Sequence, residues 1–103
     1  MEITPEIRTN FKVACRTVAQ RLRDGFVPGR EVCFNPDGSP CCSIGHVLSE
    51  AGLGDSIHEY ADFADLALIE DCRTVYLPND DQDFPAVAVE LDQIADRLDG
   101  AVF

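Results

Sequence analysis

The fold is decided first by residues 4–25, which read TPEIRTNFKVACRTVAQRLRDG. Thr4 is a suitable helix N-cap, Pro5 suits the first helical position, and Gly25 is a natural stop after the last turn. Apolar residues recur here at three- and four-residue steps, the period of an amphipathic helix: Ile3, Ile7, Phe11, Ala14, Val18 and Leu22. The stretch therefore predicts a first helix with one apolar face.

A basic stripe follows one side of this apolar face, within an arc of roughly 80° at about 100° per residue. Its members are Arg8, Lys12, Arg16 and Arg23. Such a stripe is often a solvated flank whose long stems lie over the edge of the core. It can also bind a partner, and both interpretations stay open at this point.

Three further helices are predicted. One spans residues 39–52, where Ser-Pro repeats the opening of the first helix and glycine ends it. The next begins at Ile57, because Ser56 and Glu59 have the spacing of a capping box. The last spans residues 83–100, from an aspartate that suits an N-cap to a terminal glycine.

Two short extended segments accompany these helices. Residues 35–38, Asn-Pro-Asp-Gly, suit a type I turn, and the apolar run 32–34 before them favours a short β-hairpin. Residues 74–77, Thr-Val-Tyr-Leu, read as an extended segment that could pair with this hairpin. We therefore expect a helix-dominated α+β fold, with four helices packed against a small β-hairpin or short antiparallel sheet. Residues 1–103 are expected to form a single domain, since a chain of this length holds one core.

The charge of the chain is strongly negative and unevenly distributed. There are 8 Lys and Arg against 19 Asp and Glu, a net charge of -11, and 46% of the residues are hydrophobic, which argues against disorder. Residues 1–30 hold six basic and three acidic residues, whereas residues 31–103 hold two and sixteen. This uneven distribution of charge has two interpretations. The basic helix packs against acidic helices within the fold, or the acidic part forms a surface that binds a basic partner.

The same composition limits the partners and the compartment. Binding to a nucleic-acid backbone or to an anionic membrane is disfavoured, because both are negatively charged. No apolar run approaches the length of a membrane span, and the N-terminal MEITPEIRTN lacks a signal pattern. We therefore expect a cytoplasmic protein without a cofactor, whose partner is another protein with a basic surface.

The expected partner-binding surface lies on the third and fourth predicted helices. Acidic residues lie opposite the apolar face of each helix, and three apolar residues of the third, Phe63, Leu66 and Ile69, fall outside its apolar face. The third helix is therefore either sandwiched between two layers or exposes a hydrophobic patch. The expected binding residues are Glu59, Asp62, Phe63, Asp65, Leu66, Asp92, Asp96 and Asp99. A sharper variant of this hypothesis is a nucleic-acid mimic, whose carboxylates occupy the basic groove of a DNA-binding protein.

Five cysteines are many for so short a chain: Cys15, Cys33, Cys41, Cys42 and Cys72. The odd number and the missing signal pattern argue against a secreted disulfide framework. Cys15 and Cys72 sit in helical patterns and are expected as buried, small apolar residues.

Residues 41–46, Cys-Cys-Ser-Ile-Gly-His, are the place where reactive residue types cluster. In one interpretation Cys42, in the first turn of a helix, is a nucleophile and His46 is its base, oriented by a residue of segment 79–81. In this alternative the protein is a cysteine-dependent enzyme.

Two other interpretations of the segment involve no catalysis. Zinc could be held by Cys33, Cys41, Cys42 and His46 in a stapled binding module, although adjacent cysteines in a helix point about 100° apart. In the interpretation that the pattern favours, one cysteine packs inward and Gly45 lets another segment approach closely. We therefore assign no catalytic or metal-binding residue.

The chain from about Leu22 onward resembles a group of small uncharacterised proteins of actinobacteria and their phages. The likeness rests on residues 24–26 and 37–48, on Asn79-Asp80 and on the final amphipathic helix. Those proteins carry an Asp-Gly turn, a Cys-x-x-Gly-x-Leu helix start and an Asn-Asp loop before the last helix. This chain departs from them at His46, where a small residue is common. The resemblance implies a phage-encoded protein in a bacterial cytoplasm, which would bind and modulate a host protein.

Overall fold

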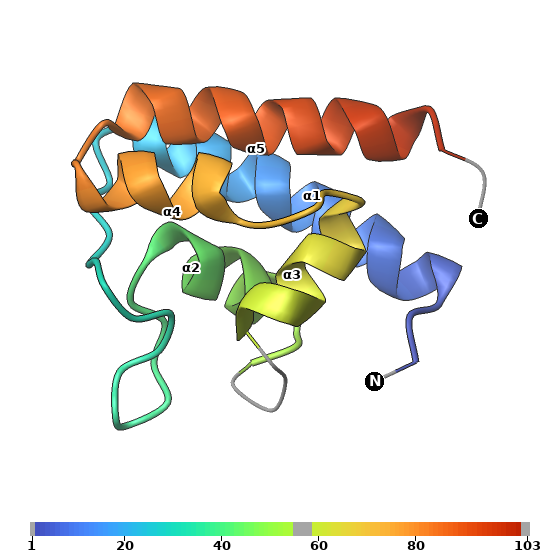
Figure 1. The fold of residues 1–103 in the computed structure, drawn as a ribbon, viewed down its shortest axis with the longest axis horizontal. Coiled ribbons are helices and arrows are strands. Elements are labelled where there is room, and N and C mark those ends of the chain that lie inside the picture. Colours follow the sequence, from blue (N-terminus) through green and yellow to red (C-terminus); the bar gives the residue numbers. More distant parts are fainter. Residues whose placement is uncertain (1, 55–58, 102–103) are drawn as a thin grey trace.

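The computed structural model describes residues 2–54 and 59–101. In these stretches the chain forms five α-helices: α1 (Pro5–Arg23), α2 (Ser43–Glu50), α3 (Glu59–Ala67), α4 (Arg73–Asp80) and α5 (Phe84–Asp99) (Figure 1). No strand occurs in the described residues. The expected α+β class with four helices and a small sheet is therefore wrong, and the fold is helical.

The first and last helices begin and end as their sequences predict. The Thr4 hydroxyl accepts the Ile7 amide at 3.2 Å, and Gly25 follows the last turn of α1 with φ 99°. At the start of α5 the Asp83 carboxylate accepts the Ala86 amide at 3.4 Å. Both helices therefore carry their own caps, which satisfy amides that no earlier turn can reach.

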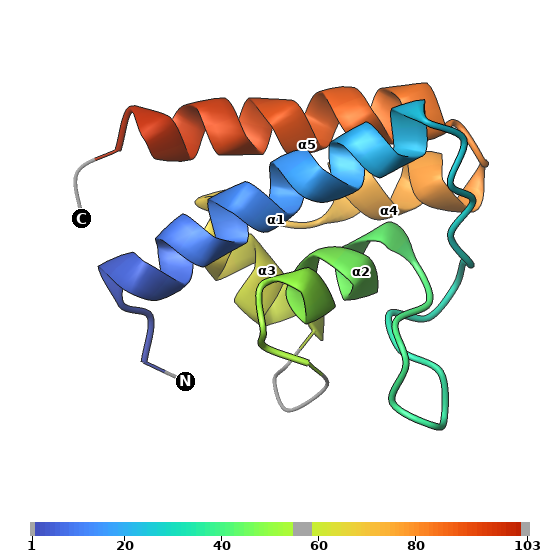
Figure 2. The ribbon, with the colours of Figure 1, turned by 180° about the vertical axis from the view of Figure 1, so that it is seen from behind.

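The two long helices, α1 and α5, pack against each other along most of their length (Figures 1 and 2). The short helix α4 lies beside α5, and α2 and α3 lie below α1 on the other side of the molecule. The Phe11 ring of α1 meets the Phe63 ring of α3 edge to face, 5.1 Å between centroids. Leu48, Val75 and Leu91 are fully buried in the same core, so that all five helices contribute to it.

The predicted hairpin is reduced to a turn. The Gly38 amide donates to the Asn35 carbonyl at 2.9 Å with φ 88° at Gly38, so the expected turn is present. Beyond it, only one isolated antiparallel bridge, Phe34 to Pro40, is found in the described residues. Pro40 has no amide hydrogen and α2 begins soon afterwards, so the ladder cannot extend.

Two other element predictions are wrong in position or type. Residues 74–77 belong to α4 rather than to an extended segment, because Val75 is buried in the core and the Asp71 carboxylate accepts the Arg73 amide at 2.8 Å at the helix start. Helix α2 begins at Ser43 rather than at residue 39, since the Cys41 amide is bound to the Cys33 carbonyl at 2.7 Å.

The start predicted for the third helix, Ser56 to Ile57, lies outside the described residues; α3 itself is present from Glu59. Within the described part of the chain, no helix combines the length and the apolar character that crossing a membrane requires.

Candidate functional site

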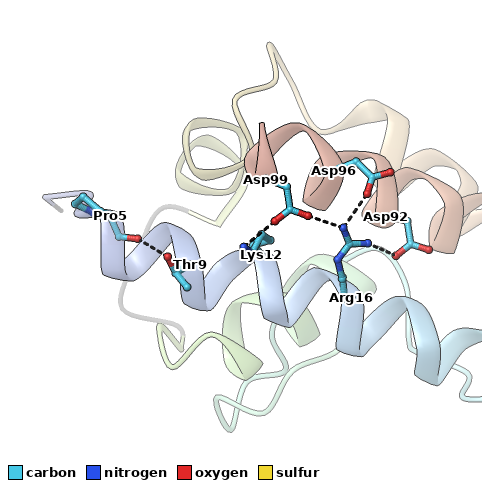
Figure 3. Close-up of polar contacts among 7 residues, drawn as sticks. All are labelled: Pro5, Thr9, Lys12, Arg16, Asp92, Asp96 and Asp99. Atoms are coloured by element: carbon cyan, nitrogen blue, oxygen red, sulfur yellow. Dashed lines mark hydrogen bonds and ion pairs between the residues drawn. The ribbon is translucent and has the colours of Figure 1, made fainter. Parts of the chain in front are cut away.

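The acidic residues of α5 face the basic stripe of α1, not a partner (Figure 3). Arg16 lies 2.7 Å from Asp96, 2.8 Å from Asp99 and 3.6 Å from Asp92. Lys12 adds a 2.8 Å ion pair with Asp99. Three of the residues expected to bind a partner are therefore occupied within the chain, and the internal interpretation of the charge split holds for α1 and α5.

The basic and acidic groups of this contact shift each other's pKa values. The hydrogen bond from Lys12, followed by that from Arg16, holds the pKa of the Asp99 carboxyl below its ordinary value. The hydrogen bonds to Asp96 and Asp99 raise the pKa of the Arg16 guanidinium. These side chains are exposed, so each pair is screened by water and salt.

The rest of the basic stripe is also used inside the fold. Arg23 forms an ion pair with Asp92 at 2.5 Å. Arg8 donates to the carbonyl of Leu66 at 2.8 Å and to that of Asp65 at 3.0 Å. A cation at the C-terminal end of a helix such as α3 binds carbonyls that no later turn can satisfy. The stripe therefore makes contacts within the fold while its side chains stay partly exposed.

Two of the three apolar residues expected to form a docking patch, Phe63 and Leu66, are part of the core, whereas Ile69 lies after the end of α3 and is half-buried. Phe63 and Leu66 are both 0% exposed, because α3 contacts α1, α2 and α5. The structure therefore selects the sandwiched alternative for this helix. Asp65 is exposed and Asp62 half-buried on α3, while the side chain of Glu59 lies outside the described part of the structure.

Helix α2 begins at a buried polar junction built from the Asn-Asp segment. The Asn79 side-chain oxygen accepts the Ser43 amide at 3.1 Å and the Ser43 hydroxyl at 2.5 Å, and its amide group donates to the Gly29 carbonyl at 3.0 Å. The next residue, Asp80, accepts the Glu31 amide at 3.0 Å. Residues 79 and 80 thus connect the end of α4 to the start of α2 and to residues 29–31, which precede the turn at residues 35–38.

The reactive segment separates its cysteine and its histidine. The Cys42 thiol, at the N-cap of α2, shares a hydrogen bond with the Cys33 thiol. The His46 ring packs edge to face on Phe26, 4.7 Å between centroids. Burial, followed by the charge of Arg21, lowers the pKa of His46. In the described structure this is not the arrangement of a nucleophile with its base.

Gly45 has the close-approach role that its sequence context predicts. A Cβ atom at this position would overlap the carbonyl oxygen of Cys33. The predicted burial of Cys15 and Cys72 is confirmed as well. Across the described residues, no three His, Cys, Asp or Glu side chains are grouped so that they could hold a metal ion, which removes the geometric basis of the zinc interpretation.

The surface is hollowed on both sides of the connection between α3 and α4. One hollow, of about 370 Å³, is mainly apolar and is lined by Tyr60, Ala61, Ala64, Glu70, Asp71, Cys72 and Tyr76. The other, of about 440 Å³, is lined by Leu68, Ile69, Glu70, Asp71, Thr74, Glu90, Gln93, Ile94 and Arg97. Glu70 and Asp71 line both hollows. We call the two hollows together the connection groove.

Two aromatic rings and one leucine give the connection groove its apolar character. Tyr60 and Tyr76 lie with ring centroids 5.5 Å apart, and Tyr60 is 40% exposed. Leu68 is 45% exposed and has φ 58°, a backbone conformation that is costly for a leucine. The Cys72 thiol donates to the Tyr60 carbonyl at 3.1 Å. Burial, followed by the charge of Asp71, raises the pKa of Cys72 to about 11.

Sequence reasoning missed the connection groove because its residues come from α3, from the connection after it, from α5 and from α4, whose first residues were expected to be extended. The available signal was the run Leu68 to Asp71, in which two apolar residues are followed directly by two acidic ones. Comparisons of the chain with protein-family models, with curated proteins and with solved structures gave no significant match.

Proposed function

We propose that this protein is a non-enzymatic interaction module, and that its connection groove binds a basic segment of a protein partner through an apolar anchor. The expected class of partner is unchanged, but the binding surface differs from the one that the sequence suggested. Phe63 and Leu66 are buried, and the carboxylates of α5 are paired with α1. We therefore place the proposed binding surface at the α3–α4 connection.

Leu68 is the observation that carries the proposal. A glycine or an asparagine would adopt its positive φ at lower cost, and its exposed side chain gains little from burial in the free protein. Unfavourable backbone conformations are found where they serve binding. A large, exposed apolar side chain that lines a hollow is typical of a residue that contacts a partner.

The charge around Leu68 supports a basic partner. The hollow that Leu68 lines contains three acidic residues, Glu70, Asp71 and Glu90, and one basic residue, Arg97. Residues 59–90 carry nine acidic residues and one basic residue, Arg73, which is paired with Asp71. The basic residues of α1, by contrast, are engaged by α5, by α3 or, for Arg21, by Glu50 of α2. An acidic surface around an apolar anchor accelerates association with a cationic segment and disfavours an anionic one.

We do not extend the proposal to a nucleic-acid mimic, because three of the six carboxylates that the variant required, Asp92, Asp96 and Asp99, are ion-paired with α1. An enzymatic role is not favoured either, since Cys42 and His46 contact different groups. The resemblance to actinobacterial and phage proteins, together with free thiols at all five cysteines, supports a bacterial cytoplasm as the compartment and a host protein as the partner.

Selection from a displayed library of random peptides tests the proposal. We expect the selected peptides to carry Lys or Arg around a large apolar residue, and their binding to weaken as salt is raised. Leu68→Ser and Glu70→Gln should each weaken binding of the selected peptides. Leu77→Ser, at a leucine exposed on α4 outside the groove, and Glu2→Gln, before α1, are the matched controls.

Two results would contradict the proposal. One is a set of selected peptides without basic residues. The other is binding that Leu77→Ser reduces as much as Leu68→Ser does, which would place the contact elsewhere on the surface.

A further inference from the structure

Two cysteine thiols lie against each other at the start of α2. Cys33 and Cys42 are 0% and 2% exposed. The backbone brings the two residues together, because the Cys41 amide donates to the Cys33 carbonyl at 2.7 Å and the Cys42 amide to the Val32 carbonyl at 3.1 Å. The Cys33 side chain is close enough to be the first cause of the lowered pKa of Cys42. The absence of a Cβ at Gly45 permits this approach.

The two thiols are not equivalent. The hydrogen bond with Cys33, and the backbone amides of Ile44 and Gly45, lower the pKa of Cys42, while burial and the charge of Asp80 oppose them. These amides belong to the first turn of α2, where amides lack an acceptor within the helix. We therefore assign Cys42 as the nucleophile, because its pKa is lowered and the thiolate is the reactive form of a cysteine.

Cys41 is adjacent in sequence but points elsewhere. Its sulfur is 3.9 Å from the Arg30 carbonyl and would be overlapped by a Cβ added to Gly29. Burial, followed by the charge of Cys42, raises the pKa of Cys41. The chain thus contains a matched control: a cysteine one residue away, more exposed than Cys42, and directed to another segment.

We propose that Cys33 and Cys42 are an oxidisable pair, which hydrogen peroxide converts into an intramolecular disulfide. The Cys42 thiolate attacks one peroxide oxygen, the O–O bond breaks, and Cys42 becomes a sulfenic acid while hydroxide leaves and is protonated to water. The Cys33 sulfur then attacks the Cys42 sulfur. The S–S bond forms, the S–O bond breaks, and the hydroxyl leaves with the Cys33 thiol proton as a second water. The two thiols supply the two electrons that peroxide accepts.

Peptide mapping of the full chain tests this assignment. After peroxide treatment, remaining thiols are alkylated and the chain is cut before aspartates, so that peptide 24–36 contains Cys33 and peptide 37–54 contains Cys41 and Cys42. We expect these two peptides to be disulfide-linked in the wild type and in Cys41→Ser. The link should be lost in Cys33→Ser and in Cys42→Ser.

The Cys42 sulfenic acid can be trapped directly. This second measurement does not require a substitution of Cys42, which could disturb folding. A 1,3-diketone that traps sulfenic acids should label Cys42 in the wild type at short times, and should accumulate there in Cys33→Ser, where no resolving thiol remains. A link that survives in Cys42→Ser, a link that is lost in Cys41→Ser, or trapping on Cys41 instead of Cys42 would each overturn the proposal. So would a wild-type chain that forms no link while peroxide oxidises its other residues.

Discussion

The α1–α5 face and the connection groove are both rich in carboxylates, yet they use them in different ways. On the α1–α5 face, Asp96 and Asp99 lie within 3 Å of cationic groups of α1. At the connection groove, Glu70 and Asp71 line two hollows beside an exposed leucine. Asp71 forms an ion pair with Arg73 at 3.2 Å, and Arg73 is the one basic residue against nine acidic residues in the segment 59–90. The comparison shows that the placement of cations decides which carboxylates are neutralised within the fold, because a paired carboxylate contributes little field beyond its own pair.

The largest expected effect tests whether α3 presents its apolar residues to the core or to a partner. Phe63→Ala should lower the free energy of unfolding by about 3–5 kcal/mol, the usual cost of a cavity at a buried phenylalanine. Val89→Ala, at a half-exposed position of α5, is the control and should change little. Denaturant titration measures both. An unchanged stability in Phe63→Ala would return Phe63 to the list of partner-binding residues.

A second prediction concerns how the short helices are held. Helices α1 and α5 carry their own capping side chains, whereas the first amide of α2 depends on Asn79 of α4. Asn79→Ala should cost about 1–3 kcal/mol of unfolding free energy, because it leaves the buried amide and hydroxyl of Ser43 without this partner. Asn10→Ala, on the exposed side of α1, is the control, and equal stability of the two variants would contradict the capping role.

The third prediction separates stability from binding at the connection groove. Leu68→Gly should raise the free energy of unfolding by about 1 kcal/mol, because glycine adopts a positive φ without steric cost. At Leu77, equally exposed but inside α4, the same substitution should destabilise by about 1 kcal/mol. Thermal denaturation of the two variants gives the comparison. A destabilised Leu68→Gly would mean that the leucine serves the fold rather than a partner.

The smallest effect is expected on the α1–α5 face and depends on pH. Because the pKa of Asp99 is lowered in the folded chain, the unfolded chain binds more protons in acid. The stabilisation by Asp99 is therefore complete above the ordinary carboxyl value of about 3.9 and is lost as the pH falls through the lower folded-state value. Asp99→Asn should remove this part of the acid dependence, as measured by denaturant titration at a series of pH values.

Salt provides the control for that prediction. At neutral pH, Asp99→Asn should cause a small loss of stability that shrinks at about 1 M salt, where the Debye length is about 3 Å. Asp81→Asn, away from the α1–α5 face, should leave the acid dependence unchanged. Identical pH profiles for the two variants would show that the ion pairs do not contribute to stability.

The predictions that came true depend on local chemistry. The start of α1, the cap of α5 and the turn at Gly38 need only residues that are adjacent in sequence. The predictions that failed required knowledge of distant neighbours. Residues 74–77 have strand-forming side chains, but Val75 reaches the core only because α4 packs on α5. At the candidate site, the sequence pointed to an acidic surface but not to its location.

The sequence by itself determined the two long helices, the close approach at Gly45 and the acidic excess of the chain, because periodicity, caps, glycine and charge are properties of neighbouring residues. Only the tertiary structure decided that Phe63 and Leu66 of α3 lie in the core, that three acids of α5 are paired with α1, and that Cys42 lies beside Cys33 instead of His46. Each of these contacts joins segments that only the packing of the helices or the reversal of the chain at the 35–38 turn brings within a few ångströms, and no local pattern encodes which partner lies there.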